Sequence, residues 1–296
     1  IPSFRGKHRS RTIGDVLQEA EKLLAEGAKE LILTGQDTTY FGRDTCGRFL
    51  LADLLQKLDQ LPGDFWIRLL YAYPSCVTPE LMETMKNSRR ICHYLDMPLQ
   101  HASDRMLQAM RRGITKRKTY DLIRHFRQRV PDLAIRTTFI VGFPGETQED
   151  FEELLEFMKE IRFERLGIFQ YSQEEGTPAA RLADQIPEKI KQERFEEAML
   201  LQQSLSQEQN RKWLGKTLRV LIDEPAQIRP LPNRNSGKLA GEPPQDGLGL
   251  WSGRTFMDAP EVDGTVFVKT KKPLQAGSFY PVKIKATKEY DLVGVV

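Results

Sequence analysis

Residues 135–161 read IRTTFIVGFPGETQEDFEELLEFMKEI and combine the two patterns that decide the fold. The first seven residues, 135–141, are mostly β-branched or apolar, which is typical of a buried strand. A GFPG turn follows, and Thr147 is suited to cap a helix over 148–161, where apolar residues recur at helical spacing. This stretch therefore predicts one unit of strand, turn and helix.

The same unit recurs along the first two thirds of the chain. We expect strands at 30–33, 65–71, 94–97, 135–141 and 166–171. Helical spacing of apolar residues predicts helices at 17–28, 50–61, 78–87, 103–111, 118–129 and 148–161. Alternation of this kind indicates a parallel sheet or barrel, in which the carboxyl ends of the strands carry the chemistry. The local pattern fits an open doubly wound sheet equally well.

The last third of the chain has a different character. A long polar helix is predicted over 187–212, and short strands follow at 217–222, 248–254, 264–268 and 282–286. Short strands between turns indicate a small β-barrel. Residues 225–247 are rich in Pro, Gly and Asn, so we expect a surface loop or a disordered insertion there. The predicted domains are 1–212 and 213–296.

Composition narrows the class of protein. The chain has 44 Lys and Arg against 41 Asp and Glu, so its net charge of +3 does not suit a general nucleic-acid binder. Cys46, Cys76 and Cys92 are too widely spaced for a zinc or cluster signature. No apolar run reaches the ~18 residues of a membrane span. With no initiator Met or signal region, we expect a cytoplasmic protein whose sequence begins upstream of Ile1.

Polar and Gly-containing loops follow several of the predicted strands, and their residues are candidates for ligand binding. These residues are Gln36, Asp37, Thr38, Gln100, His101, Gly142, Phe143, Tyr171 and Ser172, and Arg136 within the strand predicted at 135–141 is a further candidate. Each loop also has a purely structural interpretation, as a tight turn or as the capped start of a helix. Ser103, for example, would cap the helix predicted at 103–111.

Taken together, several long strings resemble the methylthiotransferase branch of the radical SAM superfamily. They are IPSFRGKHRSR, LTGQDTTYFG, YLDMPLQHASD, IRTTFIVGFPGETQEDFEELLEF and YSQEEGTPAA, and they span residues 1–212. The later string GRTFMDAPEVDGTVFV resembles a TRAM domain. The resemblance implies an α/β fold: a partial parallel (β/α) radical-SAM TIM-like barrel, followed by a small all-β TRAM barrel of OB-like form.

Two subfamilies of this branch differ in substrate. One modifies an adenosine in tRNA, and the other adds a methylthio group to the β-carbon of an aspartate in a small-subunit ribosomal protein. The strings QDTT at 36–39 and DMPLQH at 96–101 resemble the ribosomal-protein subfamily. We therefore expect a ribosomal-protein substrate. The alternatives are a tRNA substrate and a non-catalytic fragment that binds RNA or protein.

The resemblance also implies the cofactors. They are S-adenosylmethionine and two [4Fe–4S] clusters, with a reductant such as flavodoxin and no membrane. In the family, a C-x-x-x-C-x-x-C loop directly precedes the string found here at 1–6, and three further cysteines lie in an earlier domain. We therefore expect the cluster ligands and the first barrel strand upstream of Ile1, and the chain alone to be inactive.

The same resemblance assigns expected positions around S-adenosylmethionine, while the catalytic residues stay unassigned. Gln36 and Asp37 would face its methionine end, with Thr38 beside them. The ribose and carboxylate would lie against Gln100, His101 and Arg136. The adenine would lie near Gly142, Phe143 and Tyr171, with Ser172 beside them.

Overall fold

The computed structural model describes residues 6–226 and 249–296. The chain divides into two compact units, Ile1–Gln202 and Gln203–Val296. Nearly all of the loop predicted at 225–247 lies outside the described residues.

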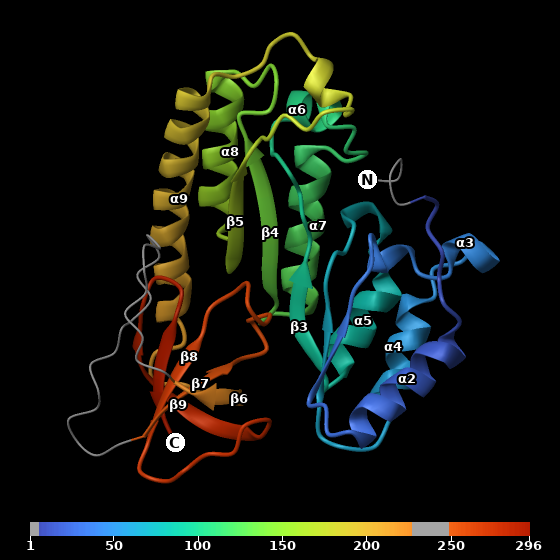
Figure 1. Ribbon diagram of the computed structural model, residues 1–296, viewed down its shortest axis with the longest axis vertical. Coiled ribbons are helices and arrows are strands. Elements are labelled where there is room, and N and C mark those ends of the chain that lie inside the picture. The colour runs from blue at the N-terminus through green and yellow to red at the C-terminus, as the bar shows by residue number, and fades with distance from the viewer. Residues whose placement is uncertain (1–5, 227–248) are drawn as a thin grey trace. The chain divides into compact units, whose positions relative to one another are not determined.

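The first unit contains a parallel five-stranded sheet in the order β1-β2-β3-β4-β5 (Figure 1). Its strands are β1 (Glu30–Leu33), β2 (Trp66–Leu69), β3 (Ile91–Asp96), β4 (Ala134–Val141) and β5 (Arg165–Gln170). All five predicted strands are present. Because each strand pairs with the next one in sequence, the sheet lacks the reversal of strand order that defines a doubly wound fold. The prediction of a partial (β/α) barrel is confirmed.

Helices alternate with these strands along the chain. They are α2 (Ile13–Ala25), α4 (Leu51–Asp59), α5 (Pro79–Asn87), α6 (Asp104–Ala109), α7 (Lys116–Arg129), α8 (Gln148–Ile161) and α9 (Glu188–Arg211), with a short α3 (Arg43–Cys46). Threonine caps start four of them: the side chains of Thr12, Thr78, Thr115 and Thr147 accept a backbone N–H of the first turn. An N-cap of this kind stabilises a helix by about 1 kcal/mol. The boundaries of these helices therefore follow from local sequence.

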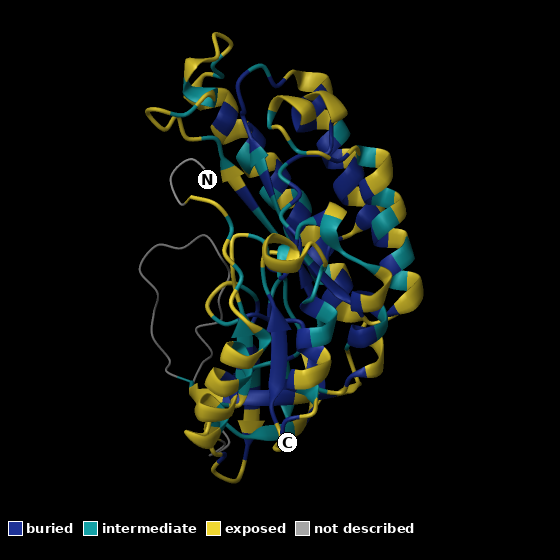
Figure 2. Cartoon of the chain, turned by 90° about the vertical axis from the view of Figure 1, so that its right-hand side faces the viewer, coloured by how far each residue is buried: buried dark blue, intermediate teal, exposed yellow. Residues whose placement is uncertain are grey.

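The two faces of β4 differ in burial. Ile135, Thr137, Phe139 and Val141 are buried, whereas Arg136, Thr138 and Ile140 are partly exposed. Phe139 packs edge-on against Phe163, with ring centroids 5.7 Å apart. Figure 2 shows the buried strands between helices whose outer faces are exposed. One face of the sheet therefore forms the core, and the other remains available for a ligand.

The second unit is a closed barrel in the order β10-β8-β7-β6-β9. Its strands are β6 (Thr217–Pro225), β7 (Gly249–Arg254), β8 (Val266–Thr270), β9 (Phe279–Thr287) and β10 (Leu292–Val295). The sequence predicted the first four but not β10. This strand has only four residues, and its Gly294 packs so closely that a Cβ there would overlap Val282. A glycine in so short a run weakens the strand signal.

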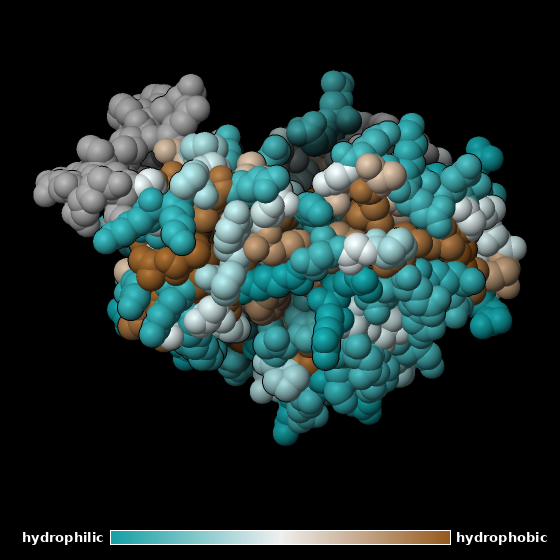
Figure 3. Space-filling model, turned by 90° about the horizontal axis from the view of Figure 1, so that it is seen from below, coloured by the Kyte–Doolittle hydropathy of each residue, from teal (hydrophilic) through white to brown (hydrophobic). Residues whose placement is uncertain are grey.

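The surface is mostly hydrophilic in the view of Figure 3, with smaller hydrophobic areas among polar residues. Of the described helices, none is long and apolar enough to cross a membrane.

Candidate functional site

The loop after β1 is fixed to the end of β2. Asp37 caps a short 3₁₀ helix, η1 (Thr38–Tyr40), and accepts the Tyr40 N–H at 3.2 Å. The Thr38 hydroxyl donates to the Leu70 carbonyl at 2.8 Å, and the Thr38 N–H donates to the Tyr71 carbonyl at 3.0 Å. The predicted site residues Asp37 and Thr38 thus shape the loop through these bonds. Gln36, directly before them, is exposed.

An ion pair joins the carboxyl end of β3 to the first half of β4. Arg136 and Asp96 are register partners, and Nη1 of Arg136 lies 2.8 Å from Oδ1 of Asp96. The other Asp96 oxygen accepts the Tyr71 N–H at 3.1 Å. Asp96 therefore links the end of β3 to the residues after β2 and to the first half of β4. The predicted site residue Arg136 keeps 16% of its side chain exposed, so it can still reach a ligand.

Gln100 continues the pairing of the sheet beyond β3. Its N–H donates to the Thr138 carbonyl at 2.8 Å, and its own carbonyl accepts the Ile140 N–H at 2.8 Å. The residue holds φ at 76°, a left-handed conformation that is costly for a residue with a side chain. Tyr71, after β2, has φ of 58°. Strained backbone of this kind clusters at functional sites.

His101 lies in a buried network of hydrogen bonds that involves the loops after β3 and β4. Its side chain has no exposed surface, its Nδ1 accepts the Ser103 N–H at 3.0 Å, and its Nε2 lies 3.2 Å from Oε1 of Glu146. Oε2 of Glu146 accepts the Gly142 N–H and pairs with Arg194 of α9, whose Nη1 lies 3.0 Å away. With both ring nitrogens engaged, His101 positions the loops after β3 and β4 in this conformation.

The loop after β4 packs against α9. Gly142 has φ of 73°, and a Cβ there would overlap the Lys191 side chain. Phe143 meets Tyr171 edge-on, with centroids 5.3 Å apart, and the Lys191 ammonium lies 5.5 Å from the Tyr171 ring centroid. The next residue, Ser172, is exposed and donates to Glu174 at 2.8 Å. The structure thus brings Gly142, Phe143 and Tyr171 together.

The less buried face of the sheet presents a flat apolar surface near these loops. Ile140 and Phe169 are register partners on β4 and β5, and Phe169 is 57% exposed. Thr138 and Gly167 form the preceding pair. An exposed aromatic side chain beside a small residue offers room for a planar group to stack.

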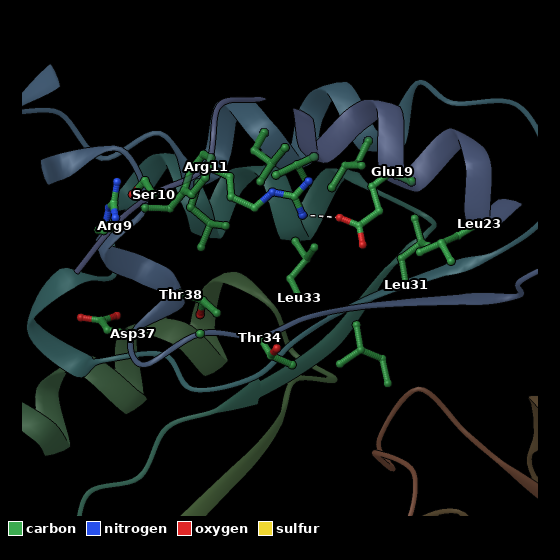
Figure 4. Close-up of a pocket in the computed structure, with 18 of the residues that line it drawn as sticks. Arg9, Ser10, Arg11, Glu19, Leu23, Leu31, Leu33, Thr34, Asp37 and Thr38 are labelled. Atoms are coloured by element: carbon green, nitrogen blue, oxygen red, sulfur yellow. Dashed lines mark hydrogen bonds and ion pairs between the residues drawn. The ribbon is translucent and has the colours of Figure 1, made fainter. Parts of the chain in front are cut away.

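A cavity of about 420 Å³ runs along β1 and is also lined by residues of α2 and α4 (Figure 4). Arg9, Ser10 and Arg11 line one side, and Leu31 and Leu33 of β1 line another. The loop residues Thr34, Asp37 and Thr38 also line the cavity, as Figure 4 shows. The loop after β1 therefore contributes to a hollow at the edge of the sheet.

The sequence analysis did not single out Asp96, Glu146 or Arg194. Asp96 and Glu146 lie within sequence strings quoted above. An acidic residue in a predicted strand or after a turn containing Gly and Pro could have marked them as candidate site residues. Arg194 gave no such signal, because it lies in a long helix with many charged residues. Its burial depends on contacts with residues distant in sequence.

The described residues do not fit an iron–sulfur cluster. Within 6–226 and 249–296 there is no group of three or more His, Cys, Asp or Glu side chains that could hold a metal ion. Cys46 is exposed, Cys76 is partly exposed and Cys92 is buried, and none of the three forms a disulfide. No reaction step through a cluster can be derived from these residues.

Comparison with known proteins places the chain among its relatives. It is 45% identical over 296 residues to the "Ribosomal protein uS12 methylthiotransferase RimO" of Desulfitobacterium hafniense, covering 100% of this chain and 62% of that protein. The protein of the same name from Pelotomaculum thermopropionicum is 47% identical over 294 residues, covering 99% and 62%. The chain thus spans about 62% of the length of these relatives.

Domain models and a solved structure agree with the fold. Coproporphyrinogen III oxidase (HemN) from Escherichia coli, a radical SAM enzyme, superposes with a TM-score of 0.50 at 20% identity, covering 65% of this chain and 46% of that one. The TRAM domain model matches residues 240–296, which include four strands of the closed barrel. The radical SAM superfamily model matches residues 1–158, more than half of the chain. The chain therefore belongs to the radical SAM superfamily.

Proposed function

We propose that the complete protein containing this chain adds a methylthio group to the β-carbon of an aspartate in ribosomal protein uS12, by radical S-adenosylmethionine chemistry. The observation that carries the proposal is the 45% identity to a uS12 methylthiotransferase, which extends over all 296 residues and so includes both units. The strings at 36–39 and 96–101 support the same substrate.

S-adenosylmethionine would lie on the less buried face of the sheet. Phe169 and Ile140 would receive its adenine, near the Phe143–Tyr171 pair. Arg136 would approach its ribose and carboxylate from β4, held in direction by Asp96. The residues of this chain bind and orient the cofactor, and orientation of bound reactants supplies much of the rate enhancement in such enzymes.

The remaining predicted residues would act mainly through the backbone. Asp37 and Thr38 fix the loop after β1, which places the exposed Gln36 beside the methionine end. Gln100 would fix the loop after β3 through its bonds to β4. His101 would serve as a positioning residue because it is fully enclosed. Ser172 would remain at the exposed rim near the adenine.

The proposed chemistry requires two [4Fe–4S] clusters and a reductant such as flavodoxin. The ligands of the clusters would come from residues outside the described ranges. The TRAM barrel would contact the substrate, and we expect it to hold ribosomal protein rather than tRNA.

The test is a reaction of the complete, anaerobically purified protein with uS12 and, separately, with unmodified tRNA. The proposal expects mass spectrometry to find one methylthio group on an aspartate of uS12 and none on tRNA. Modification of a tRNA adenosine instead would replace this proposal with the alternative subfamily. Modification of neither would refute it.

A further inference from the structure

Two aromatic side chains of the first unit are exposed. Among the residues that the structure describes, Tyr71 is 47% exposed and Phe169 is 57% exposed, and every other aromatic side chain is more buried than these two. Phe169 is assigned above to the adenine of the cofactor. Tyr71 follows β2 by two residues, at the carboxyl edge of the sheet, and the proposed function gives it no role.

The backbone of Tyr71 is fixed by the loops on both sides of it. Its carbonyl accepts the Thr38 N–H at 3.0 Å, from the loop after β1. Its N–H donates to Oδ2 of Asp96 at 3.1 Å, at the end of β3. These bonds hold Tyr71 at a φ of 58°, a left-handed conformation that is rare for a bulky side chain. Such conformations cluster where ligands bind, so the position of this residue points to a functional role.

The ring of Tyr71 contributes little to the fold itself. Within the described part of the chain, its hydroxyl forms no hydrogen bond and no other aromatic ring packs against it. The neighbouring Leu69 and Ala72 are 1% and 2% exposed, so the apolar core at this point is formed by other side chains. A strained backbone that presents an unpartnered aromatic ring to solvent is expected where a binding partner supplies the contacts.

Asp96 connects Tyr71 to the proposed cofactor site. While its Oδ2 holds the Tyr71 N–H, its Oδ1 lies 2.8 Å from Nη1 of Arg136, the residue proposed to approach the ribose. The target aspartate has to reach the bound cofactor in order to react, so a segment of uS12 must enter at the carboxyl edge of the sheet. The adenine is placed at β4 and β5, so the exposed ring after β2 remains available to the substrate.

We propose that the ring of Tyr71 contacts the segment of uS12 that carries the target aspartate. The inference rests on the proposed function and adds a substrate-binding residue to it. Tyrosine is enriched among the residues that dominate protein interfaces, because its ring offers a large contact area at a low entropic cost. Since the backbone of Tyr71 is already fixed, the residue loses little further freedom when the substrate binds.

The test compares a variant that keeps the left-handed backbone with one that keeps the ring. Asparagine tolerates this conformation, so Tyr71→Asn removes the ring and leaves the loop in place, whereas Tyr71→Phe retains the ring. The control is Arg162→Asn, at an exposed residue with φ of 56° that lies between α8 and β5, at the opposite edge of the sheet.

The complete protein of each variant is titrated with two ligands. A labelled uS12 peptide that spans the target aspartate is followed by fluorescence anisotropy, and S-adenosylmethionine is followed by equilibrium dialysis. Urea unfolding checks that each variant is folded. Tyr71→Gly, which also accepts the left-handed backbone, replaces Tyr71→Asn if that variant does not fold.

We expect Tyr71→Asn to bind the peptide roughly 10-fold or more weakly than wild type, with unchanged affinity for S-adenosylmethionine. Tyr71→Phe and Arg162→Asn should bind both ligands as wild type does. Unchanged peptide affinity in Tyr71→Asn, equal weakening of both ligands, weakening of the cofactor alone, or a Tyr71→Phe variant as weak as Tyr71→Asn each overturns the proposal. Failure of the proposed function is separate: wild-type protein then does not modify uS12 at all, whereas this inference is decided by differences between variants.

Discussion

Removal of the Glu146 carboxylate should destabilise the first unit strongly. Glu146 is 3% exposed and accepts from Arg194, from the Gly142 N–H and from the His101 ring. In Glu146→Ala, the Arg194 guanidinium remains buried, and its one remaining hydrogen-bond acceptor among the described residues is the Glu146 carbonyl, 3.2 Å away. Removing one partner of a buried ion pair costs about 3–5 kcal/mol, so we expect a loss in that range.

The isosteric Glu146→Gln should also lose stability, but less than Glu146→Ala. Because Nδ1 of His101 accepts the Ser103 N–H, a neutral ring carries its proton on Nε2, facing Glu146. The side-chain amide of Glu146→Gln would have one oxygen that accepts and one NH₂ group that donates. Its NH₂ group must therefore face either the Nε2–H of His101 or the donors of Arg194 and Gly142. A donor facing a donor leaves a buried group unsatisfied, which costs about 1–3 kcal/mol.

The assay is urea unfolding, followed by circular dichroism, of wild type, the two Glu146 variants and Glu156→Gln. Glu156 is an exposed residue of α8, and its change should alter the free energy of unfolding by less than about 0.5 kcal/mol. The double variant Glu146→Ala/Arg194→Met should recover part of the loss, because no orphaned charge remains. If Glu146→Ala unfolds within about 1 kcal/mol of wild type, the network does not hold the strand ends as described.

Three further results are expected. Gly142→Ala should lower the free energy of unfolding by about 1–2 kcal/mol, because alanine tolerates the left-handed φ of 73° poorly. The overlap of the new Cβ with Lys191 should add a further loss, which the double variant with Lys191→Ala relieves. Equal losses with and without the Lys191 side chain would contradict the overlap. His93 donates to Asp132 over 2.6 Å, which raises the pKa of His93, so its contribution is present below about pH 6.5 and is lost as pH rises through the folded pKa. As pH rises through that range, the free energy of unfolding should fall by less than about 1 kcal/mol, because the pair is partly exposed. His93→Gln should show no such fall. Phe139→Ala should cost about 3–5 kcal/mol by leaving a cavity among the core phenylalanines, measured by the same unfolding assay against the exposed Phe169→Ala.

The sequence predicted the strands of the first unit well because each is a short apolar run ended by Gly, Pro or polar residues. The cap at Thr147 made the start of α8 equally clear. The start of β3 at Ile91 was missed, since His93 interrupts the apolar run; in the structure its ring is paired with Asp132. Strand order could not be read locally. It depends on pairings between segments far apart in the chain.

The candidate site was predicted as a set of loops, and the structure adds how they are joined. Gly142, Phe143 and Tyr171 were selected, and they do lie together. The enclosure of His101 could not be predicted, because it depends on Arg194 from a helix that follows much later in the sequence. The spacing of charges along a polar helix does not reveal which one is buried.

The most direct test of the proposed function is a comparison of cells that carry the gene with cells from which it is deleted. Ribosomal protein uS12 and total tRNA nucleosides from both are analysed by mass spectrometry. We predict a methylthio-aspartate in uS12 that disappears on deletion and returns with the complete gene, while methylthiolated adenosine in tRNA is unchanged. Unaltered uS12 in the deleted cells, or a loss confined to tRNA, would contradict the account.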